Sequence, residues 1–172
     1  MAQNKKWALD TNVIFDLARN LEQAQTLREI ALEKHYSLHI TPTSIEEIAH
    51  KSINGNPVER KLAHYSLRHL AQWGILLLQT PEGSEAVAEQ FSAFLRAQGV
   101  LPDAEVNDGV ILAEASLAGA ALLVSSDSHL AQIDPDELRL LFEERSMAPI
   151  PVVTPNKILR IFEKQRRGFG KY

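Results

Sequence analysis

The chain alternates short apolar runs with stretches of helical periodicity, and this alternation constrains its fold more than any other feature. Parallel strands cannot be joined by tight hairpins, so each connection crosses back over the sheet, usually as a helix. The pattern therefore predicts an α/β fold with a mostly parallel, five-stranded sheet. The expected strands are residues 7–9, 38–40, 75–78, 121–124 and 150–153, and the expected helices are 11–34, 58–73, 84–98 and 106–118, with two more starting at Thr43 or Ser44 and at Pro155.

Length and composition fit one domain, spanning residues 1–172, with a substantial core. Of the 172 residues, 45% are hydrophobic, which is typical of a soluble globular protein. No apolar run approaches the ~18–20 residues of a membrane helix, and the N-terminus lacks the apolar stretch of a signal peptide. Cysteine is absent, which excludes disulfides, thiolate metal sites and a cysteine nucleophile. We therefore expect a cytoplasmic protein with no membrane partner.

Charge is distributed unevenly along the chain. The formal net charge is −4, yet residues 157–172 contain six basic side chains and one acid, which leaves −9 for residues 1–156. A basic C-terminal tail, at about 164–172, on an acidic body is consistent with a nucleic-acid contact. It is equally consistent with a solvated helix end whose basic side chains complement the helix dipole.

The stretch from Val106 to Ala118 has helical length but is apolar or small at nearly every position. A helix that is apolar on all sides is normally buried. Asp108 is therefore expected near the start of a core helix, on the same face as Leu112 and Ala115. Because burying an unpaired charge is expensive, this carboxylate needs a specific reason to be there.

Two of the expected strands end in an aspartate, since Asp10 follows residues 7–9 and Asp127 follows residues 122–126. Ligands of open parallel sheets bind at the carboxyl ends of the strands, near the switch in strand order. If the two strands are neighbours, their aspartates lie side by side, and Asp108 joins them from the buried helix. Clustered carboxylates resist ionisation unless a cation is present. All-oxygen ligands favour Mg²⁺ or Mn²⁺, and Mg²⁺ commonly binds substrate phosphates.

Four segments occur in order along the chain: Ala8-Leu9-Asp10-Thr11-Asn12-Val13; Ile40-Thr41-Pro42 with Glu47-Ile48; Asn107-Asp108 with Ala113 and Ala115; and Leu122-Leu123-Val124-Ser125-Ser126-Asp127. Together with a final Val153-Thr154-Pro155 and Leu159, they resemble the PIN-domain nuclease family over nearly the whole chain. The resemblance implies a three-layer α/β/α fold. It also implies hydrolysis of RNA phosphodiesters with one or two Mg²⁺ or Mn²⁺ ions.

The resemblance assigns roles to six residues of this chain. Asp10, Glu47, Asp108 and Asp127 match the family's four catalytic, metal-binding acids. Asn12 and Ser125 match polar positions that orient the site or the substrate, and Ser125 keeps the hydroxyl of the threonine that the family often has there. In the expected reaction the ion makes hydroxide available near neutral pH and neutralises charge on the phosphate, leaving a 5′-phosphate and a 3′-hydroxyl.

Structural interpretations compete with these roles. Asp10 and Asp127 are also suitable helix caps, and an acid at the position of Asp108 gains from the helix dipole. Glu46 competes with Glu47, because Glu46 flanks the apolar face of its expected helix more closely, while the family pattern prefers Glu47.

Other polar residues fit structural roles better. Asp103 and Glu105 are interpreted as a cap and a first-turn acid before the buried helix, with Asp103 a further candidate ligand. The histidines lack the spacing of a zinc site, although His64 and His69 are candidates for RNA contact. Trp7 and Trp73 are interpreted as packing residues.

Three classes of function remain open. The first is a metal-dependent endoribonuclease, either a housekeeping RNA-processing enzyme or a toxin that forms a homodimer and is blocked by a small antitoxin protein. The chain is somewhat long for a toxin, with the extra length at about residues 52–73, so a housekeeping nuclease remains an alternative. The second class is a catalytically silent RNA-binding or regulatory module, which is disfavoured because all four acids are present. The third is a phosphatase with an aspartyl nucleophile, which is disfavoured because position 12, where that chemistry uses a second aspartate, holds Asn12.

Overall fold

The computed structural model describes residues 5–169 of the chain, with side chains described as far as residue 165. Its described strands form one five-stranded sheet in the order β3-β2-β1-β4-β5, and every pairing is parallel. Each strand overlaps a predicted run, which confirms the expected sheet. The strands are β1 (Lys6–Leu9), β2 (Ser37–Ile40), β3 (Ile75–Leu77), β4 (Leu122–Val124) and β5 (Val152–Val153).

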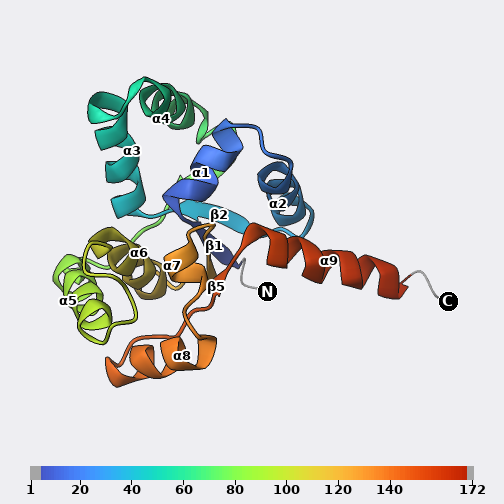
Figure 1. Ribbon diagram of the computed structural model, residues 1–172. Coiled ribbons are helices and arrows are strands. Elements are labelled where there is room, and N and C mark those ends of the chain that lie inside the picture. Colours follow the sequence, from blue (N-terminus) through green and yellow to red (C-terminus); the bar gives the residue numbers. More distant parts are fainter. Residues whose placement is uncertain (1–4, 170–172) are drawn as a thin grey trace.

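Helices cover both faces of the sheet. Those of the described part are α1 (Thr11–Ala18), α2 (Glu22–Glu33), α3 (Pro42–Asn54), α4 (Pro57–His69), α5 (Ser84–Ala97), α6 (Val106–Leu117), α7 (Ser128–Ala131), α8 (Pro135–Glu144) and α9 (Pro155–Phe169). Successive strand residues point to opposite faces, so Ala8 and Leu123 enter the core under α5, α6 and α8. Leu9 and Val124 enter the core under α1, α2 and α9. The result is the three-layer α/β/α arrangement that the resemblance implies (Figure 1).

The structure corrects several predicted helix boundaries. The single helix expected over residues 11–34 is two helices, because Asn20 adopts a left-handed conformation, with φ of 58°, between α1 and α2. The N-cap of α3 is Thr41 instead of Thr43 or Ser44, and its hydroxyl accepts a hydrogen bond from the Ser44 amide at 3.2 Å. Helices α7 and α8 are absent from the predicted elements.

The sheet order places the switch point of the chain between β1 and β4. Strand β1 pairs with β2 on one side and with β4 on the other, with Leu9 opposite Val124. The Asp10 amide continues this ladder by donating to the Val124 carbonyl at 2.9 Å. The residues that follow these strands, Asp10 and Asp127 among them, therefore emerge at one edge of the sheet, where α/β proteins bind ligands.

The last helix, α9, packs against α2 and extends away from the body of the protein (Figure 1). The predicted basic tail at about 164–172 begins within α9, but residues 170–172 and the side chains from 166 onward lie outside the described residues. Within residues 5–169, none of the helices has both the length and the apolar character required to cross a membrane.

Candidate active site

Asp10 is the buried acid at the end of β1, and only 3% of its surface is exposed. It is the N-cap of α1. Its Oδ1 accepts a hydrogen bond from the Thr11 amide at 2.7 Å, and its Oδ2 accepts one from the Ser125 hydroxyl at 2.7 Å. Burial, followed by the nearby charges of Glu47 and Asp127, raises the pKa of Asp10 to about 6. Its carboxylate is thus fixed in place although it lacks a cationic partner among residues 5–165.

Ser125 connects the two strand-end acids. It is fully buried, and besides donating to Asp10 it accepts a hydrogen bond from the Asp127 amide at 3.0 Å. Asp127 in turn caps α7, because its Oδ1 accepts from the amides of His129 at 2.7 Å and Leu130 at 3.3 Å. Both aspartates therefore fill the capping roles that their sequence context allows and also lie in one cluster of charges.

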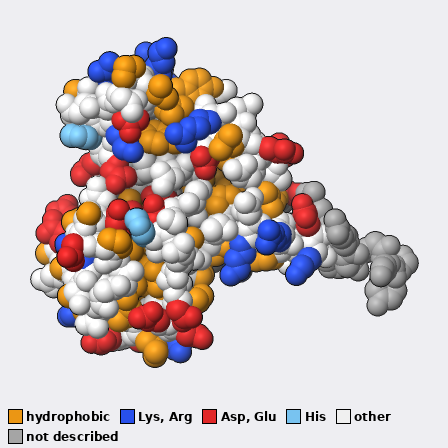
Figure 2. Space-filling view, in the orientation of Figure 1, with side chains coloured by type: hydrophobic (Ala, Val, Ile, Leu, Met, Phe, Trp, Pro, Cys, Tyr) orange, Lys and Arg blue, Asp and Glu red, His pale blue; other side chains and the backbone are white. Residues whose placement is uncertain are grey.

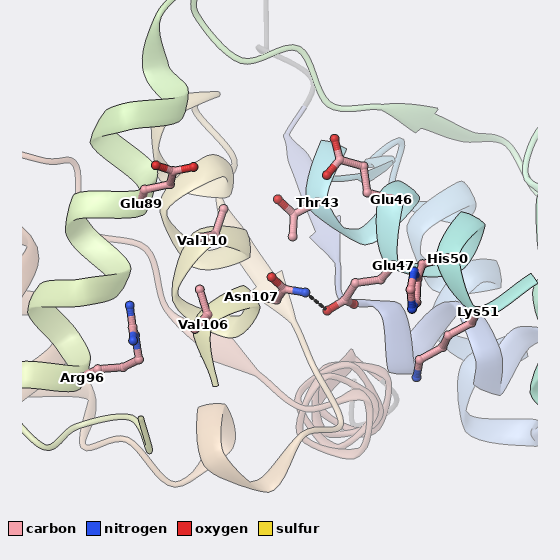
Figure 3. Close-up of a pocket in the computed structure, with 10 residues that line it drawn as sticks. All are labelled: Thr43, Glu46, Glu47, His50, Lys51, Glu89, Arg96, Val106, Asn107 and Val110. Atoms are coloured by element: carbon pink, nitrogen blue, oxygen red, sulfur yellow. Dashed lines mark hydrogen bonds between the residues drawn. The ribbon is translucent and has the colours of Figure 1, made fainter. Parts of the chain in front are cut away.

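Glu47 reaches the same cluster from α3. Its Oε2 accepts a hydrogen bond from the Thr11 hydroxyl at 2.5 Å, and its Oε1 accepts one from the Asn107 side-chain amide at 2.8 Å. Glu46 is exposed and points away from the contact between Glu47 and Asn107 (Figure 3). Its charge acts instead on Glu114. The geometry therefore brings Glu47, and not Glu46, to the strand-end acids.

Asp108 and Glu114 are both acids of α6, but only Glu114 has its hydrogen bonds satisfied. The Glu114 carboxylate accepts from the hydroxyl and the amide of Thr43, at 2.8 and 3.2 Å, at the start of α3. The Asp108 Oδ2 atom is buried without a hydrogen-bond partner. Burial, followed by the charges of Asp10 and Asp127, raises the pKa of Asp108 to about 8. An orphaned carboxylate oxygen among other carboxylates is suited to a divalent cation, so the donor set fits the metal that the sequence predicts.

The start of α6 differs from the prediction. Glu105, and not Asp103, occupies the N-cap position, and its side chain makes no capping hydrogen bond. One carboxylate oxygen each of Glu105 and Asp108 and a ring nitrogen of His129 lie within 4.8 Å of one another. Asp103 is an exposed residue outside this group, and its carbonyl accepts a long bond of 3.4 Å from Arg96.

A cleft of about 630 Å³ opens beside the acids, between α3 on one wall and α5 and α6 on the other. Acidic side chains gather along this hollow in the space-filling view (Figure 2). Lys51 on α3 and Arg96 on α5 lie on opposite sides of the cleft, with Glu47 and Asn107 between them (Figure 3). Neither cation forms an ion pair with an acid of residues 5–165, although Glu46, Glu47 and Glu89 share the lining.

Sequence reasoning missed the residues that hold Glu47. Thr11 and Asn107 are adjacent in sequence to Asp10 and Asp108, and that adjacency was the available signal. Asn12, which the resemblance assigns to site orientation, is exposed on the first turn of α1, while the hydroxyl of Thr11 makes the contact with Glu47. Ser125 does lie where an orienting residue would, between Asp10 and Asp127.

Comparisons with known proteins agree with this fold. The family model of the PIN domain matches residues 8–135. A chain from the crystal structure of VapBC2 from Rickettsia felis, bound to a DNA fragment from their promoter, superposes with a TM-score of 0.60 at 12% identity, covering 87% of this chain and 98% of that one. A chain of DNA-bound VapBC from Salmonella typhimurium gives 0.57 at 17% identity, covering 88% and 98%. A chain of FitAcB from Neisseria gonorrhoeae gives 0.51 at 18% identity, covering 87% and 97%.

A search of curated proteins finds no significant match. The family match nevertheless includes the end of β1, all of β4 and every acid of the cluster. It covers well over half of the chain and agrees with the three-layer fold and with the order of the motifs. The chain therefore belongs to the PIN domain family.

Proposed function

We propose that this protein is a cytosolic, metal-dependent endoribonuclease that hydrolyses RNA phosphodiester bonds with Mg²⁺ or Mn²⁺. Asp10, Glu47, Asp108 and Asp127 would hold the metal and so constitute the catalytic site. The observation that carries the proposal is the buried, unpartnered Oδ2 of Asp108 among like-charged carboxylates at the switch point of the sheet. The chain belongs to a family whose members are generally nucleases, and this membership supports the proposed nuclease activity.

The bound ion would supply an activated water and would neutralise charge on the phosphate oxygens. The chain's own residues would preorganise the site. Ser125 holds Asp10 by a hydrogen bond of 2.7 Å, and Thr11 and Asn107 hold both oxygens of Glu47. Because these donors fix the carboxylates before substrate arrives, little reorganisation is left for the reaction itself.

The charge pattern of the cleft supports a nucleic-acid substrate. A chain of phosphates would be repelled by the acids unless cations flank them. Lys51 and Arg96 lie on the two walls, and neither forms an ion pair with an acid of residues 5–165. Each is placed to neutralise a phosphate on either side of the bond to be cut. Cleavage within a strand, as opposed to removal of a terminal phosphate, fits a cleft with a cation on each wall.

Incubation of the purified protein with mixed RNA and Mn²⁺ tests the proposal. We expect fragments with 5′-phosphate ends from the wild type, none after chelation with EDTA, and a loss of at least about 10³-fold in the rate for Asp10→Asn. Asp134→Asn is the matched control, because it makes the same exchange at the exposed N-cap of α8. Inert wild-type protein, or equal activity of Asp10→Asn, would refute catalysis and leave the silent binding module. Release of phosphate from a small monoester without RNA cleavage would favour the phosphatase.

We further propose that the protein acts as the toxin of a toxin–antitoxin pair and forms a homodimer. The support is that solved chains of similar fold occur in the complexes named VapBC and FitAcB. In that role its expression should arrest growth, and co-expression of a small protein encoded beside it should restore growth. Arrest by Asp10→Asn as well would contradict the toxin role, and absence of any arrest would favour a housekeeping nuclease. Light scattering of the purified protein tests the dimer.

A further inference from the structure

The inference concerns the side of the acidic cluster formed by Glu105, Asp108 and His129. These three residues come from two elements, the start of α6 and the first turn of α7. One donor atom from each lies within 4.8 Å of the other two. The Nδ1 atom of His129 is 3.5 Å from Glu105 Oε1 and 3.7 Å from Asp127 Oδ1. The imidazole is the one nitrogen donor in this group, and all the other donors are carboxylate oxygens.

Within the described residues, none of the three side chains makes a hydrogen bond that binding of a metal ion would have to break. Glu105 is the N-cap of α6 but does not use its carboxylate for capping. Asp108 Oδ2 is buried and has no hydrogen-bond partner. His129 is half exposed, and the contacts of its Nδ1 with the two acids exceed hydrogen-bonding distance. A buried oxygen without a partner, beside a nitrogen and a further carboxylate within reach, is an arrangement that a metal ion would complete.

We propose that His129 and Glu105, together with Asp108, coordinate the metal of this site, so that it selects a first-row transition-metal ion over Mg²⁺. This proposal rests on the metal site of the proposed function. Mg²⁺ is bound almost entirely by oxygen, whereas an imidazole nitrogen favours transition metals. His129 and Glu105 thereby extend the ligand set beyond the four acids and decide between the two ions that the acids alone leave open.

A competing explanation is that His129 is only the cationic partner of Glu105 and Asp127. The two explanations predict opposite effects of removing the ring. If His129 were a cation beside the acids, its loss would strengthen binding of a divalent ion, because a repelling charge disappears. If His129 is a ligand, its loss weakens the binding of Mn²⁺ and affects Mg²⁺ less.

The test uses Mn²⁺ as the probe, with binding measured by electron paramagnetic resonance and by competition with Mg²⁺. The electron spin echo of the Mn²⁺-loaded wild type should show coupling to one ¹⁴N nucleus, and His129→Ala should lack it. His129→Ala and Glu105→Gln should each weaken Mn²⁺ binding at least about tenfold. Two matched controls on the cleft walls, His50→Ala and Glu89→Gln, should leave Mn²⁺ affinity within about twofold.

Three results would overturn the proposal: no ¹⁴N coupling in the wild type, coupling that survives in His129→Ala, or unchanged or stronger Mn²⁺ binding by that variant. Misfolding of a variant does not obscure the outcome. The nitrogen coupling is first measured on the wild type, and His129 is exposed, so its exchange for alanine should not disturb the fold. The readout is also separate from cleavage. Nitrogen coupling without RNA cleavage would support this inference and refute the nuclease, and metal-dependent cleavage without nitrogen coupling would do the reverse.

Discussion

Exchanging Asp10 for asparagine should stabilise the metal-free protein above pH 6, although the same change should abolish cleavage. Asp10 is 3% exposed, so water screens its charge very little. Burial and the neighbouring acids raise its pKa from 3.8 to about 6. Asparagine keeps the shape and the capping ability of aspartate but carries no charge. The variant therefore removes an ionisation that the folded protein resists.

The size of the stability gain follows from the pKa of Asp10 in the unfolded chain, 3.8, and in the folded protein, about 6. Because the folded-state pKa is raised, the folded protein binds more protons than the unfolded chain between pH 3.8 and 6, so the free energy of unfolding decreases as the pH rises through that window. One pKa unit corresponds to about 1.4 kcal/mol. The predicted gain of the variant over the wild type is therefore roughly 3 kcal/mol at pH 8 and about 1 kcal/mol at pH 4.5.

Urea denaturation in EDTA, followed by circular dichroism at several pH values, measures this difference. Asp134→Asn is again the control, because it makes the same exchange at an exposed cap of α8 and removes no buried charge. Saturating Mn²⁺ should reverse the order, since the ion stabilises the wild type by mass action and the variant much less. A variant that is no more stable than the wild type at pH 8, or a gain that is independent of pH, would refute the reasoning.

Three further predictions concern other parts of the site. Ser125→Ala removes two buried hydrogen bonds at the strand edge and should lower the free energy of unfolding by about 1–3 kcal/mol in urea titrations; an unchanged midpoint would contradict it. Gly109→Ala places a Cβ 2.7 Å from the Ser92 backbone and should cost about 1–3 kcal/mol, seen as a lower melting temperature. Lys51→Ala and Arg96→Ala, made in an inactive background, should each weaken single-stranded RNA binding and reduce its salt slope by about 0.7 in anisotropy titrations. Equal slopes would place the RNA elsewhere.

The fold and the position of the site could be predicted because they depend on patterns that repeat along the chain. Apolar runs mark the strands, and parallel pairing brings the ends of β1 and β4 together. Asp10 and Asp127 could therefore be placed at one edge from the sequence. The buried setting of Asp108 was visible in its apolar helix, and the structure adds that its Oδ2 lacks a partner.

The choice between Glu46 and Glu47 illustrates what periodicity cannot supply. Helix α3 packs against both α4 and α6. Its two adjacent glutamates both lie toward α6, one near Asn107 and the other near Glu114, so one apolar stripe does not say which of them faces the site. Glu47 contacts Thr11 and Asn107, whereas Glu46 lies near Glu114. That distinction depends on the rotation of α3 relative to its neighbours, and tertiary packing determines this rotation.

Helix α8, which is absent from the predicted elements, did have a usable signal in the sequence. Asp134-Pro135 is a cap followed by proline at the first helical position, and Leu138, Leu141 and Phe142 follow at helical spacing. The sequence gives a weaker signal for the contact between Glu105 and His129, because these residues are far apart in sequence and meet only when the start of α6 packs beside α7. Their proximity could not be read from either segment alone.

The pairing of β1 with β4 also sets when during synthesis the site can exist. Asp10 lies near the start of the chain, whereas Ser125 and Asp127 come after more than a hundred further residues. A growing chain on the ribosome has no metal site until β4 has left the exit tunnel and docked beside β1. The nuclease proposed here would therefore remain inactive toward the message and the ribosomal RNA around it until β4 and Asp127 had been made and had left the ribosome.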